Sequence, residues 1–301
     1  MVMLHPFNGV NIFGNGADGA GPAAGNLANN AYNYTSWNIT GVITLDTGTS
    51  YGTTIKVQND LIVTGRIQVD GEGDPGVTAW GSAANGQAAG AGGAGGAACG
   101  VAADRIETVT GQDFWSGWGE SGWSGYVSGP VSLGPGRQRL VLLVGGKITL
   151  DMDPAPGPQI GATGGTGILA PAGGGGGGLV VLISGQGIEF TLQAPNPIDI
   201  PHIAAYGGLG AAGSAVYYGA GGGGGGAVIL MAPKITGDDA VAIKVNGGLG
   251  GAPAAGVGTA GGGGGSFGAG GNSGAGGHTN GYPGGDGEIY KLLTSPLPLF
   301  R

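Results

Sequence analysis

Short apolar runs, each closed by glycine and followed by a second short run, dominate the pattern of hydrophobic and polar positions in this chain. The clearest examples are Leu140–Val144 before Lys147–Leu150, Leu179–Ile183 before Ile188–Leu192, and Val228–Met231. The first run of each pair is almost continuously apolar, which is typical of β-strands buried on both faces. The pattern therefore predicts pairs of strands joined by tight glycine turns.

The N-terminal part of the chain carries weaker strand signals. Trp37–Leu45 and Thr53–Asp70 are rich in β-branched residues and are divided by glycine and asparagine, as expected of short strands separated by turns. Near the C-terminus, Glu288–Leu293 resembles half of the later unit. Because no segment keeps an apolar period of 3.6 residues, we expect almost no helix.

Glycine tracts separate the strand pairs at a regular distance. The chain has 77 glycines among 301 residues, and the hexaglycine runs Gly173–Gly178 and Gly221–Gly226 begin 48 residues apart. Repeats of about 20–50 residues indicate solenoids or stacked arrays. We predict an all-β protein with a β-solenoid-like or stacked β-sheet body. Beside this body, we expect ordered, extended segments of polyglycine-II type, packed too closely for a Cβ.

Shifts in composition divide the chain into three predicted regions. Residues 1–45 form an N-terminal attachment segment, and residues 46–136 form a first β unit with a small-residue tract and an aromatic insertion. Residues 137–301 carry the glycine-rich β repeats and a C-terminal docking tail.

The low content of charged residues and the first residues of the chain exclude several kinds of partner and location. Charged residues make up 9% of the chain and the net charge is −8 with only 10 Lys and Arg, which argues against binding to nucleic acid or to an anionic membrane. The apolar runs are too short to span a bilayer, and the first residues lack the basic start and long apolar stretch of a signal peptide. The single Cys99 excludes a disulfide framework. We expect synthesis in a cytoplasm, without a secretion signal.

The repeated unit resembles glycine-rich phage tail-fibre adhesins and related virion surface proteins whose tips contain polyglycine-II layers. The resemblance rests on pattern and composition, and it is carried by Ala220–Leu230, Lys234–Gly237, Val241–Gly251, Asn29–Thr40 and Thr64–Gly73. It implies a non-enzymatic virion component exposed at the point of host contact. No functional residue is transferred, because the recognition loops of such adhesins are not shared with this chain.

Aromatic residues supply the main candidate contact site. Trp115, Trp118 and Trp123 lie within nine positions and are followed by Tyr126, with serine and glycine between them. Such side chains expose flat surfaces that stack on sugars or anchor a protein partner. The insertion is open to two interpretations, a structural plug or subunit interface and a platform for a receptor. The pair Tyr217 and Tyr218 is a secondary candidate, as is the loop His278–Tyr282.

Two further groups of residues carry weaker signals. Asp70, Glu72 and Asp74 are spaced like the start of a calcium loop but lack its distal bidentate glutamate, so we interpret them as polar strand ends facing water, with a cation site as the alternative, and no cofactor is expected. In the apolar tail, Leu297, Leu299 and Phe300 are expected to dock onto a neighbouring protein, or else to fold back on their own strand edge.

These observations favour a structural virion protein, not an enzyme, that binds the host surface from a tail fibre or tip. Its expected partners are copies of itself and other virion proteins, with a host glycan or protein open as a further partner. A capsid decoration or vertex protein is the first alternative. A polysaccharide depolymerase would require a carboxylate pair, for which Asp238 with Asp239, or Asp104 with Glu107, are available. A cellular or archaeal surface filament subunit is the remaining alternative.

Overall fold

The structure is a computed structural model that describes part of the chain. The described residues are 12–28, 31–45, 53–68, 104–105, 115–116, 139–152, 158–164, 173–174, 176–192, 200–215, 218–237, 242–253 and 280–296. All regular elements within these ranges are β-strands. Accordingly, the described part contains no helix that is long and apolar enough to cross a membrane.

The strands form three stacked parallel sheets and one hairpin. Sheet A contains β1 (Gly25–Leu27), β4 (Val42–Leu45), β7 (Arg66–Gln68), β12 (Ile160–Gly161), β15 (Ile203–Ala204) and β18 (Ile243–Lys244). Sheet B contains β2 (Ala31–Tyr34), β5 (Thr53–Val57), β10 (Arg139–Val144), β13 (Leu179–Ser184), β16 (Ala227–Ala232) and β19 (Glu288–Leu293). Sheet C contains β3 (Trp37–Ile39), β6 (Leu61–Val63), β11 (Lys147–Met152), β14 (Gly187–Leu192) and β17 (Ile235–Thr236). The antiparallel hairpin pairs β8 (Asp104–Arg105) with β9 (Trp115–Ser116).

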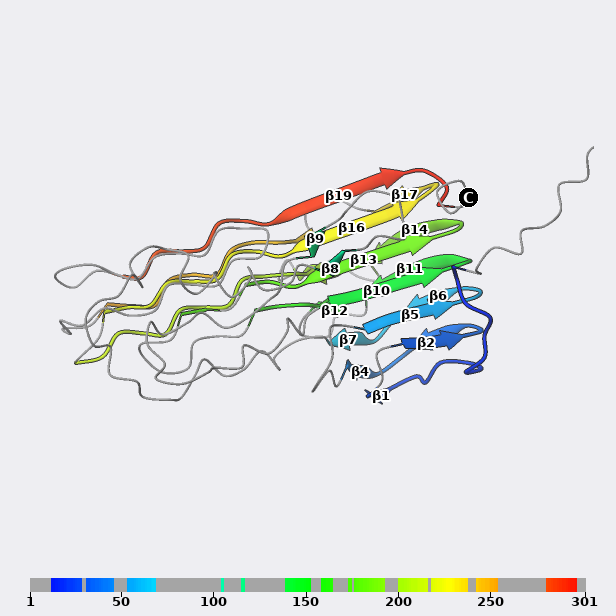
Figure 1. Cartoon of the computed structure of the whole chain (residues 1–301), viewed down its shortest axis with the longest axis horizontal. Helices are drawn as coiled ribbons and strands as arrows, with labels where there is room; N and C mark the ends of the chain where they lie inside the picture. Colours follow the sequence, from blue (N-terminus) through cyan, green and yellow to red (C-terminus); the bar gives the residue numbers. More distant parts are fainter. Residues whose placement is uncertain are drawn as a thin grey trace, which may run out of the picture.

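The order of the strands makes the body a solenoid. The chain visits sheets A, B and C in turn, and each strand pairs in parallel with the strand one coil later (Figure 1). The predicted all-β, solenoid-like body is therefore confirmed. The predicted strand pairs correspond to β10 with β11 and β13 with β14, and each pair supplies sheets B and C of one coil. The predicted half unit at the C-terminus is β19, which begins a further coil in sheet B.

The register between parallel strands of successive coils stacks identical apolar side chains inside the solenoid. In sheet A, Ile43, Ile67, Ile160, Ile203 and Ile243 occupy the same position in successive coils. The first four of these side chains are fully buried. Corresponding ladders from sheets B and C face the same interior, so a single apolar core runs along the solenoid axis.

Sheet B is apolar on both of its faces. Leu142 and Leu182 point into the solenoid core, whereas Val141, Val181 and Ile229 belong to a second buried cluster on the other face. Phe13, from the N-terminal segment, packs in that second cluster. Strands β13 and β16 are consequently buried at every position, as predicted from their continuous apolar runs.

The two ends of the solenoid differ. At the N-terminal end, residues 18–22 run along the first coil, where the Asp18 and Gly21 amides donate to the Asn33 and Ser36 carbonyls and the Trp37 indole donates to the Pro22 carbonyl. At the C-terminal end, β19 pairs with β16 and forms the edge of sheet B. Ile289, Tyr290 and Leu293 on this edge strand are exposed.

Candidate binding surface on the glycine-rich layer

Three glycine-rich excursions with described segments leave the solenoid from sheet A and return to it at sheet B. They connect β12 to β13, β15 to β16, and β18 to β19. Their described outward segments are 162–164, 205–215 and 245–253, and their described return segments are 173–174 with 176–178, 218–226 and 280–287. Figure 1 shows these segments extending away from the strands, one excursion above another. We refer to them together as the glycine-rich layer.

Backbone hydrogen bonds between outward segments recur at every third residue. The amides of Gly207, Gly210 and Gly213 donate to the carbonyls of Asn246, Leu249 and Ala252, over 2.9, 2.9 and 2.8 Å. The constant offset shows that the two segments run parallel. They thus continue the register of β15 and β18, in which Ile203 pairs with Ile243.

The return segments follow the same rule. Gly174 and Gly177 donate to Gly221 and Gly224, and Gly222 and Gly225 donate to Tyr282 and Gly285. These segments also run parallel to each other.

Further bonds join outward and return segments, which run antiparallel. Gly223 donates to the Gly208 carbonyl over 2.9 Å and accepts from the Gly248 amide over 2.7 Å. One return segment therefore bonds to two outward segments as well as to its parallel neighbours.

The contacts within this layer exclude side chains. An ideal Cβ on Gly207 would overlap the Gly223 carbonyl, one on Gly222 would overlap the Gly248 carbonyl, and one on Gly248 would overlap the Gly208 carbonyl. Because backbone atoms cannot move aside as a flexible side chain can, glycine is required at these positions by close approach.

Side chains of the outward segments project in three rows on one face. The first row is Thr163, Tyr206 and Asn246, the second row is Leu209 and Leu249, and the third row is Ala212 and Ala252. Within a segment, the row positions are three residues apart. Leu209 is 47% exposed and Leu249 is 67% exposed, so the second row stands in solvent.

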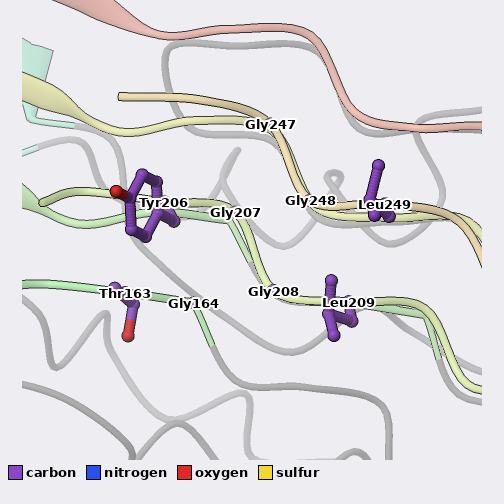
Figure 2. A pocket seen from close by; sticks show the side chains of 9 residues that line it. All are labelled: Thr163, Gly164, Tyr206, Gly207, Gly208, Leu209, Gly247, Gly248 and Leu249. Carbon is purple, nitrogen blue, oxygen red and sulfur yellow. The ribbon is translucent and has the colours of Figure 1, made fainter. Parts of the chain in front are cut away.

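A groove of about 320 Å³ separates the first row from the second. Figure 2 shows Thr163 and Tyr206 along one side, Leu209 and Leu249 along the other, and glycine backbone between them. The floor is formed by Gly164, Gly207, Gly208, Gly247 and Gly248. Tyr206 is half-buried, and burial raises the pKa of its hydroxyl above the ordinary value of 10.0.

One charged side chain, that of Asp286 in the segment before β19, contacts the glycine-rich layer. The Asp286 carboxylate accepts hydrogen bonds from the Gly247 amide over 3.0 Å and from the Asn246 side-chain amide over 3.5 Å. It therefore ties the third excursion's return segment to its outward segment. The groove itself is lined only by uncharged residues.

Most predicted contact residues lie outside the described residues. These are Trp118, Trp123, Tyr126, Tyr217, Leu297, Leu299 and Phe300, together with the candidate cation ligands Asp70, Glu72 and Asp74. For Trp115, the structure gives the backbone alone, in β9. Tyr218 is half-buried in a return segment. Tyr282, from the predicted loop His278–Tyr282, is 55% exposed.

The described residues place few chemically reactive groups together. Asp151 accepts a hydrogen bond from the Thr191 hydroxyl over 2.8 Å, and the Nε2 atom of buried His202 lies 3.0 Å from the Thr191 carbonyl. Both contacts lie at the end of sheet C and hold neighbouring segments together. Within the described ranges, no group of three or more His, Cys, Asp or Glu residues could hold a metal ion.

The groove and the three rows were not predicted from the sequence. A signal does exist, because Tyr206-Gly-Gly-Leu209-Gly-Ala-Ala212 and Asn246-Gly-Gly-Leu249-Gly-Gly-Ala252 place larger residues at every third position. A search for periods of two and 3.6 residues does not detect this spacing.

Comparisons with family models, with curated proteins and with solved structures found no match for this chain.

Proposed function

We propose that this chain is a structural virion protein of a tailed phage, carried on a tail fibre or tip, where it binds the host surface without covalent chemistry. The observation that supports this proposal most is the glycine-rich layer. Backbone hydrogen bonds join extended segments of successive coils there, at positions that leave no room for a Cβ. Such a layer serves to hold a shape and to present a surface.

We also propose that the glycine-rich layer is of polyglycine-II type. Its hydrogen bonds recur at every third residue, whereas a β-strand repeats after two residues and a polyproline-II-type helix after three. Parallel and antiparallel neighbours occur around the same segment, 218–226. A three-residue helix accommodates this arrangement because its amides point in three directions.

The rigidity of the glycine-rich layer favours binding to a partner. A surface that is already ordered loses little conformational entropy when a partner docks, which favours attachment without a large buried area. Of the two interpretations of the aromatic insertion Trp115–Tyr126, the receptor platform would make it the host contact, with a glycan or protein of the host surface as its ligand. Other virion proteins and copies of this chain are the proposed structural partners.

Location in the particle is the first test of the proposed function. We expect mass spectrometry of purified particles to find a few copies per particle, and immunogold labelling to place them at the tail. Tens to hundreds of copies over the shell would replace the proposal with a capsid decoration role. Absence from every particle fraction would overturn both and favour the filament or the depolymerase.

Host attachment is the second test. Purified chain should bind cells that adsorb the particle, and a Trp118→Ala, Trp123→Ala variant should bind them at least tenfold less tightly if stacking aromatics form the contact. A matched control is Leu293→Ala, which removes another exposed apolar side chain from the edge strand β19. Equal binding by all three proteins would show that the aromatic insertion is not the contact.

A further inference from the structure

The excursions of the glycine-rich layer place their backbone donors at the same aligned positions. The Gly164 amide donates to the Tyr206 carbonyl over 2.8 Å, and the aligned Gly207 amide donates to the Asn246 carbonyl over 2.9 Å. Each of these bonds passes from one excursion to the next. In the third excursion, between β18 and β19, the aligned donors face the end of the stack. Figure 1 shows β19 and the segment that leads into it at this outer edge.

A carboxylate takes the place of a further carbonyl at the first of these donors. Position 247 aligns with Gly164 and Gly207, and the Gly247 amide donates to the Asp286 carboxylate over 3.0 Å. Asp286 belongs to the same excursion. The bond therefore turns back into the molecule, and it satisfies a donor that would otherwise point toward a further chain.

Two other donor positions of the third excursion are occupied by proline. Position 253 aligns with Gly213, and position 283 aligns with Gly222. The amides of both glycines donate to carbonyls of the third excursion, over 2.8 and 3.0 Å. Pro253 and Pro283 have no amide hydrogen, so neither can donate to a further chain.

The two prolines coincide with the donor pattern and do not fill the core. Within the described residues, the aligned donor positions that face the end of the stack are 247, 250, 253, 283 and 286. The chain has 17 prolines among 301 residues, so composition alone predicts fewer than one proline at five positions. Both prolines are exposed. With the Asp286 contact, three of the five positions are closed, and positions 250 and 286 keep a backbone amide.

The strand that follows the third excursion carries a charge at a core position. Leu142, Leu182 and Leu230 form one ladder of sheet B, and all three are fully buried. The next member of this ladder is Lys291, which is exposed. A further strand on β19 would have to bury its ammonium group beside the leucines, which is unfavourable. Charges that point inward from an edge strand protect a sheet against pairing with another chain.

We propose that the third excursion and β19 form a stop, which closes this end of the molecule to a further extended chain. The partner that it excludes is a second copy of this chain, whose extended segments would otherwise pair with the open donors and the sheet edge. Association between copies is thereby directed to other parts of the molecule. This inference goes beyond the proposed function and does not depend on it.

Sedimentation velocity of the full chain tests the stop. The variant Pro253→Gly, Pro283→Gly, Lys291→Leu gives this end the residue types that the preceding coil has at the aligned positions. Between about 1 and 200 μM, we expect the variant to form species of about twice the wild-type mass or more, because it regains two donors and an apolar core position.

A matched control carries the same three changes elsewhere, as Pro22→Gly, Pro233→Gly, Lys147→Leu. Pro22 is half-buried and Pro233 exposed, both outside the strands, and Lys147 pairs with Glu189 on the exposed face of sheet C. Melting curves establish that each protein is folded. The control should sediment like the wild type. Equal profiles of the first variant and the wild type, or equal association of the first variant and the control, would overturn the proposal.

Amide exchange tests the Asp286 contact without requiring association. Asp286→Ala should speed exchange of the Gly247 amide about tenfold or more, whereas Gly210, which donates to the Leu249 carbonyl, should keep its rate. Asp286→Asn retains an oxygen acceptor and should keep most of the protection. Residue-resolved NMR measures these rates. An unchanged Gly247 rate in Asp286→Ala, or equal rates in the two variants, would contradict the role of Asp286 in the stop.

Discussion

At the scale of the residue, Gly248 shows how this molecule uses the absence of a side chain. Its amide donates to Gly223, its carbonyl accepts from Gly284, and a Cβ would overlap the Gly208 carbonyl. One glycine therefore joins three segments that are distant in sequence.

Alanine at position 248 should disrupt this junction. We expect Gly248→Ala to lower the free energy of unfolding by about 2–3 kcal/mol, because overpacking against backbone cannot be relieved by a rotamer change. Gly187→Ala is the matched control, since a Cβ there would come no closer than 3.3 Å to its nearest neighbour, the Lys234 carbonyl. Chemical denaturation measures both. Equal stability of the two variants would show that the layer does not require close backbone packing.

The raised pKa of Tyr34 predicts that the protein loses stability at alkaline pH. Burial raises its pKa from 10.0 to about 12, with smaller contributions from Tyr32 and Asp18. Because the folded-state pKa exceeds that of the unfolded chain, protonated Tyr34 contributes stability below pH 10 that is lost as the pH rises from 10 to 12. Melting temperatures should fall through this window, and they should fall less in Tyr34→Phe. Parallel curves for the two proteins would contradict this assignment.

Residue-level function was harder to predict than residue-level burial. The apolar residues of Leu179–Ile183 were expected to be buried, and they are. The outward row of Leu209 and Leu249 was not expected, because an isolated leucine among glycines has no strand or helix period. Most of the predicted aromatic contacts lie outside the described residues, so their role rests on residue type alone.

At the scale of the element, the isoleucine ladder of sheet A holds the shortest strands in register. Strands β12, β15 and β18 have two residues each, and each contributes one isoleucine that stacks on the next coil. With so few backbone hydrogen bonds per strand, the stacked side chains contribute much of the stability at this corner.

Shortening one member of the ladder should therefore be costly. We expect Ile160→Ala to destabilise the protein by about 2–4 kcal/mol, because the cavity lies between fully buried neighbours, Ile67 and Ile203. The control Ile62→Ala, at a position 40% exposed in β6, should cost less than about 1 kcal/mol. Urea denaturation distinguishes the two. Similar losses of stability in the two variants would mean that the isoleucine ladder stabilises the protein no more than other apolar positions do.

The sequence pattern indicated the strands of sheets B and C in the later coils, and it missed the two-residue strands β12 and β15 of sheet A. Strands β10, β13 and β16 have six residues each, and the apolar runs within them are long enough for a continuous pattern to be recognised. A two-residue strand such as β15 has no measurable period, and its identity depends on pairing with neighbouring coils. These short strands form because they pair in register with strands of neighbouring coils, and a single sequence does not show that pairing.

At the scale of the whole molecule, the solenoid and the glycine-rich layer share one register. The outward segments continue the pairing of sheet A, and the return segments lead directly into sheet B. The repeat of 48 residues predicted a stacked body, but it did not predict that the excursions would continue the same stack.

Amide exchange should reveal this continuity. We expect the hydrogen-bonded amides of the outward segments, those of Gly207, Gly210, Gly213, Gly248 and Gly251, to exchange at least a hundredfold more slowly than those of a flexible glycine-rich peptide, since their hydrogen bonds break only when neighbouring segments separate. Hydrogen–deuterium exchange with mass spectrometry measures the rates, with a synthetic peptide of the same residues as the reference. Exchange at the peptide's rate would show that the layer does not hold together in solution.

The capped first coil and the exposed last strand give the body a direction of growth. Residues 18–22 run along the coil at one end, whereas β19 presents a sheet edge that already follows the register of β16. Since Leu179–Gly226 forms one complete turn with its excursion, tandem duplication of this segment would add a coil that pairs with both neighbours. Each duplication would raise the stack by about 4.8 Å and leave its cross-section unchanged. The height of this protein is therefore a trait that gene duplication can adjust in whole steps.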